Sequence, residues 1–189
     1  EDDELIFEEK SEAFTVGISL SSDEKYFFIS TSDHNTSEQY YFTVTEKNPK
    51  PKLIKKRKKG IIYSVNSWGD KFYMHTNENA EDFKIDYCND LTNPKWVSYI
   101  PAQNEVLIGG LTFLNNWVLR SEVSNALAKI FVKNQQNGEE EEIIFADEKV
   151  IEPGISLVQR DRNTNLIYLS YSSPKTQSRT YIYDLKTKN

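Results

Sequence analysis

A serine in a glycine-led stretch occurs twice in this chain of 189 residues, and it is the first candidate for chemistry. Gly17-Ile18-Ser19-Leu20 returns as Gly154-Ile155-Ser156-Leu157. The serine nucleophile of many hydrolases stands in a Gly-x-Ser-x-Gly turn, whose two glycines permit a sharp bend from strand to helix. Both copies lack the second glycine and have the pattern of a strand. Ser19 and Ser156 are therefore predicted to be packed or channel-lining residues, not nucleophiles.

Histidine and cysteine offer no better site. His34 and His75 lie far apart in the sequence, and Cys88 is the single cysteine. A metal site needs three or four ligands in a compact set, and a Ser-His-Asp triad is recognised by its geometry. The sequence thus predicts no catalytic residue, no metal site and no cofactor, and it leaves the substrate-binding residues unknown.

The basic run and the three tryptophans each have two interpretations, and an acidic run has one. Residues 50–59 hold six lysines and Arg57, and residues 139–142 are all glutamate. The basic run is either an anion-binding patch or an outer strand that its charge protects from edge pairing, and we favour the second. The acidic run is interpreted as leading into another outer strand. Trp68, Trp96 and Trp117 could form a ligand platform, but packing between sheets is favoured.

These residues lie within a repeating pattern of short strands. The two glycine-led stretches lie about three steps of 46 residues apart, and Gly60 and Gly110 open similar stretches between them. Several short strands in each period of 40–50 residues are typical of a β-propeller. We predict an all-β partial propeller with an incomplete ring of three and a half to four antiparallel four-stranded blades. The expected bounds are 13–56, 61–100, 106–145 and 154–189, with residues 5–9 as an outer strand of a preceding blade.

Composition limits the function classes. Aromatic residues make up 13% of the chain, which favours β-structure. A net charge of −6 argues against nucleic acid as the main partner, and no apolar run approaches the roughly 18 residues of a membrane span. The acidic N-terminus shows no secretion signal. The lone Cys88 cannot form an internal disulfide, which fits a reducing, cytoplasmic location. The chain starts without Met and stops after a strand-like run, so we expect it to be a fragment of a longer protein.

The sequence resembles a known propeller along essentially its whole length. Asp3-Glu4-Leu5-Ile6-Phe7-Glu8-Glu9-Lys10, Thr36-Ser37-Glu38 and Tyr171-Ser172-Ser173 are similar, in this order, to the propeller of the oligopeptidase B (protease II) group. This group belongs to the prolyl oligopeptidase family of serine peptidases. The resemblance implies the second half of a seven-bladed propeller that caps an α/β-hydrolase domain.

The resemblance also implies an indirect role in catalysis. The parent enzyme would cleave short peptides after Arg or Lys, and the propeller would restrict access to a Ser-Asp-His site in a hydrolase domain absent from this chain. The expected partners are that hydrolase domain and an oligopeptide substrate, with no nucleic acid and no membrane. The alternative is a free-standing propeller that acts as a protein-interaction scaffold. A carbohydrate-processing propeller would need paired carboxylates facing a cleft, and we find no such pair.

An incomplete ring has a physical consequence. Terminal blades that lack a neighbour would expose more apolar surface than monomers usually do. We therefore expect the isolated fragment to self-associate.

Overall fold

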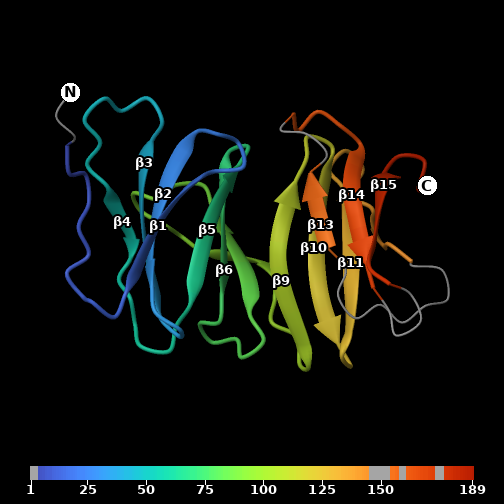
Figure 1. The fold of residues 1–189 in the computed structure, drawn as a ribbon, viewed down its shortest axis with the longest axis horizontal. Helices are drawn as coiled ribbons and strands as arrows, with labels where there is room; N and C mark the ends of the chain where they lie inside the picture. Colours follow the sequence, from blue (N-terminus) through green and yellow to red (C-terminus); the bar gives the residue numbers. More distant parts are fainter. Residues whose placement is uncertain (1–3, 145–153, 158–160, 173–176) are drawn as a thin grey trace. The chain divides into compact units, whose positions relative to one another are not determined.

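A computed structural model describes residues 4–144, 154–157, 161–172 and 177–189. These residues form antiparallel sheets joined by turns (Figure 1). The described ranges contain no helix, and so none that is long and apolar enough to cross a membrane. The predicted all-β fold class with four-stranded antiparallel sheets is thereby confirmed.

Each sheet is a meander in which strands that follow one another in sequence also pair. The first sheet comprises β1 (Thr15–Leu20), β2 (Tyr26–Ser32), β3 (Ser37–Thr43) and β4 (Lys52–Lys55). The second comprises β5 (Tyr63–Trp68), β6 (Lys71–Thr76), β7 (Lys84–Cys88) and β8 (Val97–Ile100). The third comprises β9 (Val106–Phe113), β10 (Trp117–Ser124), β11 (Leu127–Asn134) and β12 (Glu140–Glu142). The fourth has β13 (Gly154–Leu157), β14 (Leu166–Tyr171) and β15 (Arg179–Asp184).

The chain divides into two compact units, residues 1–102 and 103–189, and each unit holds two sheets and its own core. The core of the first unit gathers side chains of both its sheets, including Phe28 and Tyr41 from one and Met74 and Cys88 from the other. The second core likewise joins Leu119 and Ile130 to Ile167 and Leu169. Packing between neighbouring sheets therefore stabilises each unit through apolar burial.

The second strand of a sheet is apolar on both faces, as its sequence predicts. Phe28 and Ile29 follow one another in β2, point to opposite faces and are both buried. Phe27 lies beside Phe42 of β3, with ring centroids 5.3 Å apart. The second sheet covers the face of Phe28, and the N-terminal segment packs on the other face, where Phe7 contacts Tyr40, the partner of Ile29 in β3.

The glycines do not all open strands as expected. Gly154 is the first residue of β13, but Gly17 lies inside β1, and Gly60 precedes β5 in a turn with a φ of 80°. The glycine pair in β9 lies inside the strand, where the register with β10 shifts. A Cβ on Gly109 would lie 2.1 Å from Oγ of Ser121, so the close approach of the two strands explains a glycine there.

Two strand predictions also differ from the structure. Residues 5–9 form no strand, and membership of a preceding blade stays a prediction. The acidic run was expected to precede a strand, but Glu140–Glu142 itself forms β12. Pairing with β11 explains this, because the glutamates lie opposite apolar and basic residues there. Phe145, the expected end of this blade, lies outside the described residues.

A buried polar network joins the two sheets of the first unit. Tyr63 and Val65 of the edge strand β5 direct their N–H groups away from β6, towards β3. The Tyr63 N–H donates to Oγ of Ser37 at 2.7 Å, and the Val65 N–H donates to Oε1 of Gln39 at 2.6 Å. Side chains of one sheet thus satisfy the backbone donors of the next, as buried N–H groups require.

The Tyr63 hydroxyl pairs with backbone groups at an irregularity within the first sheet. The register between β3 and β4 shifts after Gln39. At this bulge the hydroxyl accepts a hydrogen bond from the Gln39 N–H at 2.8 Å and donates one to the Lys55 carbonyl. Burial raises the pKa of Tyr63 above its ordinary value, so the hydroxyl keeps the proton that it donates.

We predict that Tyr63→Phe lowers the free energy of unfolding by about 1–3 kcal/mol, because it leaves a buried N–H and a partly buried carbonyl without partners. Urea denaturation would measure the change. Tyr26→Phe is the matched control, since Tyr26 also packs against the first core and its hydroxyl makes no hydrogen bond to another described residue. Equal losses in the two variants would contradict the proposed role of the hydroxyl.

Candidate functional site

The structure places the candidate nucleophiles and ligands separately. Ser19 is exposed on β1, and Ser156 lies in β13. His34 is exposed in a turn of the first sheet. His75 lies on β6, where it stacks on Phe83 with ring centroids 4.6 Å apart. No group of three metal-ligating side chains occurs among the described residues.

Cys88 is a structural thiol in the first core. Its side chain is buried, and Sγ donates to the carbonyl of Asp90 at 3.6 Å. Burial raises the pKa of the thiol. Because the thiolate is the reactive form, these surroundings favour an inert cysteine.

The Thr36-Ser37-Glu38 motif lies at the junction of the first and second sheets. Oγ1 of Thr36 accepts from the Gly60 N–H at 3.2 Å, and Ser37 exchanges hydrogen bonds with the Tyr63 backbone. Glu38 accepts from the Arg57 N–H and from the Tyr40 hydroxyl, each at 2.8 Å. In the sequence, this motif was noted only as part of the family resemblance. Its role in joining the two sheets could be seen only in the structure.

Two charges of the basic run have specific partners. Arg57 makes two hydrogen bonds to Glu9, at 2.8 and 3.2 Å, and its guanidinium lies 4.2 Å from the ring centroid of Phe14. Lys55 pairs with Glu78. The interpretation of the basic run as an outer strand fits β4. Arg57, which follows β4, also binds the N-terminal segment. This segment is further held by Phe7, which packs on Tyr40 with centroids 4.7 Å apart.

The acidic run pairs with cations of its own unit. Glu140 makes two hydrogen bonds to Arg120, at 3.0 and 3.1 Å, and Glu142 pairs with Lys129 at 3.2 Å. Arg120 is buried and also donates to Glu122 at 2.7 Å. The glutamates of β12 are therefore bound to their own unit, and none of these pairs involves the basic run.

Trp96, Trp117 and the turns after the first strands connect neighbouring sheets within each unit. In the first unit, the Ser22 N–H donates to Oδ1 of Asn66 at 2.9 Å. In the second, Nε1 of Trp117 donates to Oδ1 of Asn165 at 2.9 Å, while Trp117 packs against the core. Trp96 packs against the first core. Trp96 and Trp117 thus have the predicted role in packing between sheets.

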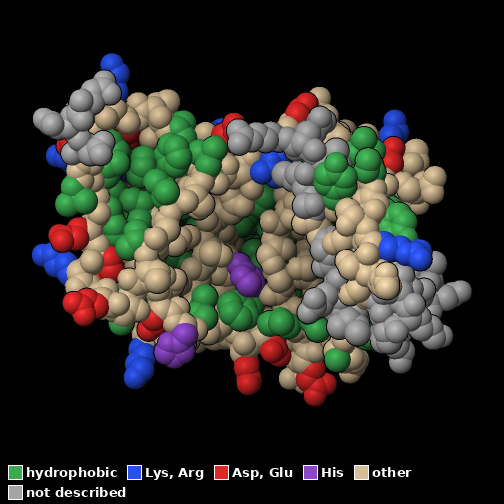
Figure 2. Space-filling view, viewed as in Figure 1, with side chains coloured by type: hydrophobic (Ala, Val, Ile, Leu, Met, Phe, Trp, Pro, Cys, Tyr) green, Lys and Arg blue, Asp and Glu red, His purple; other side chains and the backbone are tan. Residues whose placement is uncertain are grey.

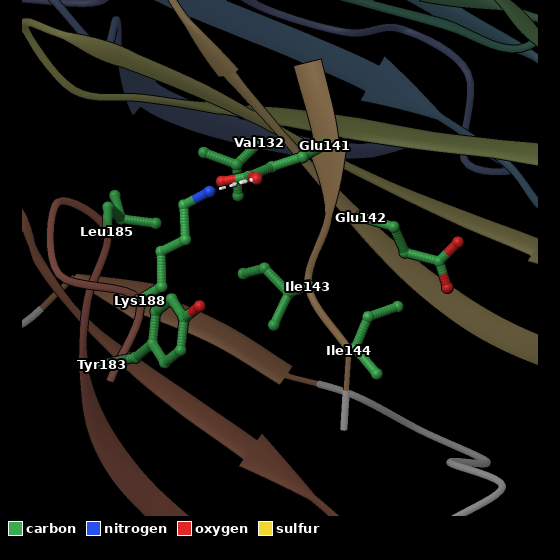
Figure 3. Close-up of a pocket in the computed structure, with 8 residues that line it drawn as sticks. All are labelled: Val132, Glu141, Glu142, Ile143, Ile144, Tyr183, Leu185 and Lys188. Carbon is green, nitrogen blue, oxygen red and sulfur yellow. Dashed lines mark hydrogen bonds and ion pairs between the residues drawn. The ribbon is translucent and has the colours of Figure 1, made fainter. Parts of the chain in front are cut away.

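A groove opens between the outer strands of the second unit (Figure 3). Val132, Ile143 and Leu185 provide apolar walls, and the Lys188 side chain extends across to Glu141, with which it pairs. This pair is exposed, so it contributes little to stability. The groove holds no set of converging polar groups that would orient a substrate.

The first strand of the first sheet presents apolar side chains to solvent. Val16, Ile18 and Leu20 alternate along β1, so they share one face, and they are 53%, 62% and 45% exposed. Figure 2 shows hydrophobic side chains at the surface over this sheet. An apolar face of this kind is typical of a surface that another element covers.

Comparisons with known proteins agree with this construction of stacked four-stranded sheets. The model of the family described as prolyl oligopeptidase, N-terminal beta-propeller domain, matches residues 1–189. The chain belongs to this family. This region is the non-catalytic N-terminal propeller domain of a family of serine peptidases.

The relatives and solved structures are larger proteins. Protease 2 of Moraxella lacunata is 31% identical over 99% of this chain and 26% of its own length. Dipeptidyl aminopeptidase BI of Pseudoxanthomonas mexicana is 26% identical over 98% of this chain and 25% of its own length. The chain thus spans about a quarter of these curated relatives. Oligopeptidase B from Trypanosoma brucei, in a closed form with covalently bound antipain, has a TM-score of 0.86 at 21% identity, covering 97% of this chain and 28% of its own.

The ion pair between Glu9 and Arg57 predicts an acid-sensitive contribution to stability. Hydrogen bonding from Arg57 lowers the pKa of Glu9 below its ordinary value of 4.5. A carboxyl with a lowered pKa stabilises the fold above its unfolded pKa, and the contribution is lost as the pH falls through the folded value.

We therefore predict that Glu9→Gln lowers the free energy of unfolding by about 1 kcal/mol at pH 7 and by progressively less below about pH 4.5. Urea titrations between pH 7 and pH 3 would measure the difference. Glu12→Gln, at an exposed position of the same segment, serves as the control. A loss for Glu9→Gln that stays constant down to pH 3 would contradict the assignment.

Proposed function

We propose that this chain is the non-catalytic propeller portion of an oligopeptidase B-like serine endopeptidase that cleaves short peptides after Arg or Lys. The observation that carries the proposal is the match of the propeller family model to the whole chain, together with 31% identity to Protease 2. In this proposal a hydrolase domain of the same parent protein supplies the Ser, Asp and His, and this chain supplies none of them.

The proposed contribution of the propeller is to restrict access. Its first strands would border a narrow route to the active site, which admits short peptides and excludes folded proteins. Closure of the propeller on the hydrolase domain would complete the site, a gating step known in many enzymes. The solved relative from Trypanosoma brucei is described as a closed form, which supports a closing movement in this family.

The first experiment compares the chain with its full-length parent protein. We expect the parent to hydrolyse fluorogenic peptides with Arg or Lys before the scissile bond, and the chain alone to show no turnover. Antipain should inhibit the parent, because it binds covalently to the Trypanosoma brucei enzyme. Turnover by the pure chain would contradict the non-catalytic role.

The access restriction needs a separate measurement. The parent should cleave a peptide of about ten residues but leave the same sequence intact when it stands in an exposed loop of a folded protein. Equal cleavage rates would contradict restricted access while leaving the peptidase assignment in place. A parent sequence without a hydrolase domain would instead favour the free-standing scaffold. We further propose a cytoplasmic location, with which the free thiol of Cys88 is compatible.

We also predict that the isolated chain self-associates, because the apolar face of β1 lacks a cover within its own unit. Light scattering should show a mass that rises with concentration, and a hydrophobic dye should bind. Ile18→Lys should reduce both signals, whereas Ile144→Lys, at a 73% exposed residue outside the strands, should not. A monodisperse monomer without dye binding would contradict this prediction.

A further inference from the structure

Charge is distributed unevenly along this chain. Residues 47–59 contain eight of its 23 lysines and arginines and no acidic residue. The rest of the chain keeps 15 basic and 29 acidic residues, so its net charge is −14 against +8 for this segment. A local field of one sign attracts partners of the opposite sign and accelerates their association.

The fold neutralises only part of this segment. Lys55 and Arg57 have carboxylate partners. The other six lysines are exposed, and none forms an ion pair with another described residue: they are Lys47, Lys50, Lys52, Lys56, Lys58 and Lys59. The three glutamates of β12, by contrast, all pair with cations. The basic segment therefore presents six positive charges that have no ion-pair partner among the described residues.

A groove with a mixed polar and apolar lining lies at the start of this segment. It has a volume of about 580 Å³ and is lined by Glu4, Leu5, Ile6, Lys47, Pro49, Lys50 and Pro51. Leu5 and Ile6 are 77% and 46% exposed, so the groove offers apolar surface beside two ammonium groups and the single carboxylate of Glu4. This combination fits a peptide that carries an apolar side chain between carboxylates.

The dimensions also favour a short peptide. The strand β4 leads from the groove to Lys56 and Lys58, and its four residues span about 13 Å. An extended peptide of about eight residues covers this path. A nucleic acid would continue past it and meet the acidic remainder of the chain, which repels phosphates.

We propose that residues 47–59, together with Leu5 and Ile6, bind an extended acidic segment of another protein. The lysines contact its carboxylates, and the groove takes an apolar side chain. The inference does not depend on the proposed peptidase substrate, since the same lysines repel an arginyl or lysyl peptide.

The test measures fluorescence anisotropy of the labelled eight-residue peptide Glu-Glu-Val-Val-Glu-Glu-Glu-Glu with the full chain, since this order places a Val between Glu residues on each face of an extended peptide. The same peptide with Gln in place of Glu is the neutral probe. The Glu peptide should bind at least about tenfold more tightly than the Gln peptide, and less tightly as NaCl increases. Lys47→Glu/Lys50→Glu and Lys56→Glu/Lys58→Glu should each weaken its binding about tenfold. Ile6→Ser should weaken both peptides to the same extent.

Lys95→Glu/Lys186→Glu is the matched control, because it makes the same charge change at exposed lysines outside the segment. It should bind the Glu peptide within about twofold of the unsubstituted chain once the added salt is moderate. Circular dichroism would verify that all variants fold. Equal binding of the Glu and Gln peptides, or equal effects of the control and the segment variants, would overturn the proposal. So would tighter binding of a single-stranded DNA 20-mer or of phosphatidylserine vesicles, which would assign the surface to another class of partner.

Discussion

The fold of the first unit depends on how an edge strand satisfies its backbone when both of its sides are buried. β5 pairs with β6 on one side only. Its other side faces β3 of the first sheet, where water is excluded and unpaired N–H groups would each cost about 1–3 kcal/mol. Ser37 and Gln39 supply oxygens at the two positions where N–H groups point outward, 63 and 65. The two sheets can therefore pack closely only with this polar contact, which also determines which residues of β3 lie beside β5.

Hydrogen bonds from one sheet to the backbone of its neighbour also occur elsewhere in both units. The Tyr63 hydroxyl bridges a bulge in the neighbouring sheet, so a side chain from one sheet completes the hydrogen bonds of another. In the second unit Arg162 donates to the carbonyl of Phe113 at 2.9 Å, and the Asn115 N–H donates to the carbonyl of Arg162. Apolar burial provides most of the stabilising free energy, whereas these directional bonds determine which strand lies opposite which.

Much of this fold could be predicted from the sequence, because strand period and turn residues are local signals. The pattern of Tyr26 to Ile29 indicated a strand buried on both faces, and that pattern is confirmed. The positions of the glycines relative to the strands were predicted less well, since Gly109 is explained by a contact with Ser121 on another strand. The roles of Ser37, Gln39 and Tyr63 could not be predicted, because each depends on a partner in a different sheet. The absence of a serine-nucleophile turn, in contrast, was visible in the sequence itself.

The ion pairs distinguish the charged side chains that take part in the fold from those that have no partner in it. Arg57, Lys55 and Arg120 are held by carboxylates in their own units, so the fold explains their presence. The remaining lysines of residues 47–59 form no ion pair with another described residue, and their mutual repulsion opposes their collection on one segment. An outer strand could be kept soluble with fewer like charges, or with mixed ones as in β15, where Arg179 and Asp184 stand at opposite ends. Edge protection accounts for charge on β4 itself, and the proposed acidic partner would account for the lysines on either side of it.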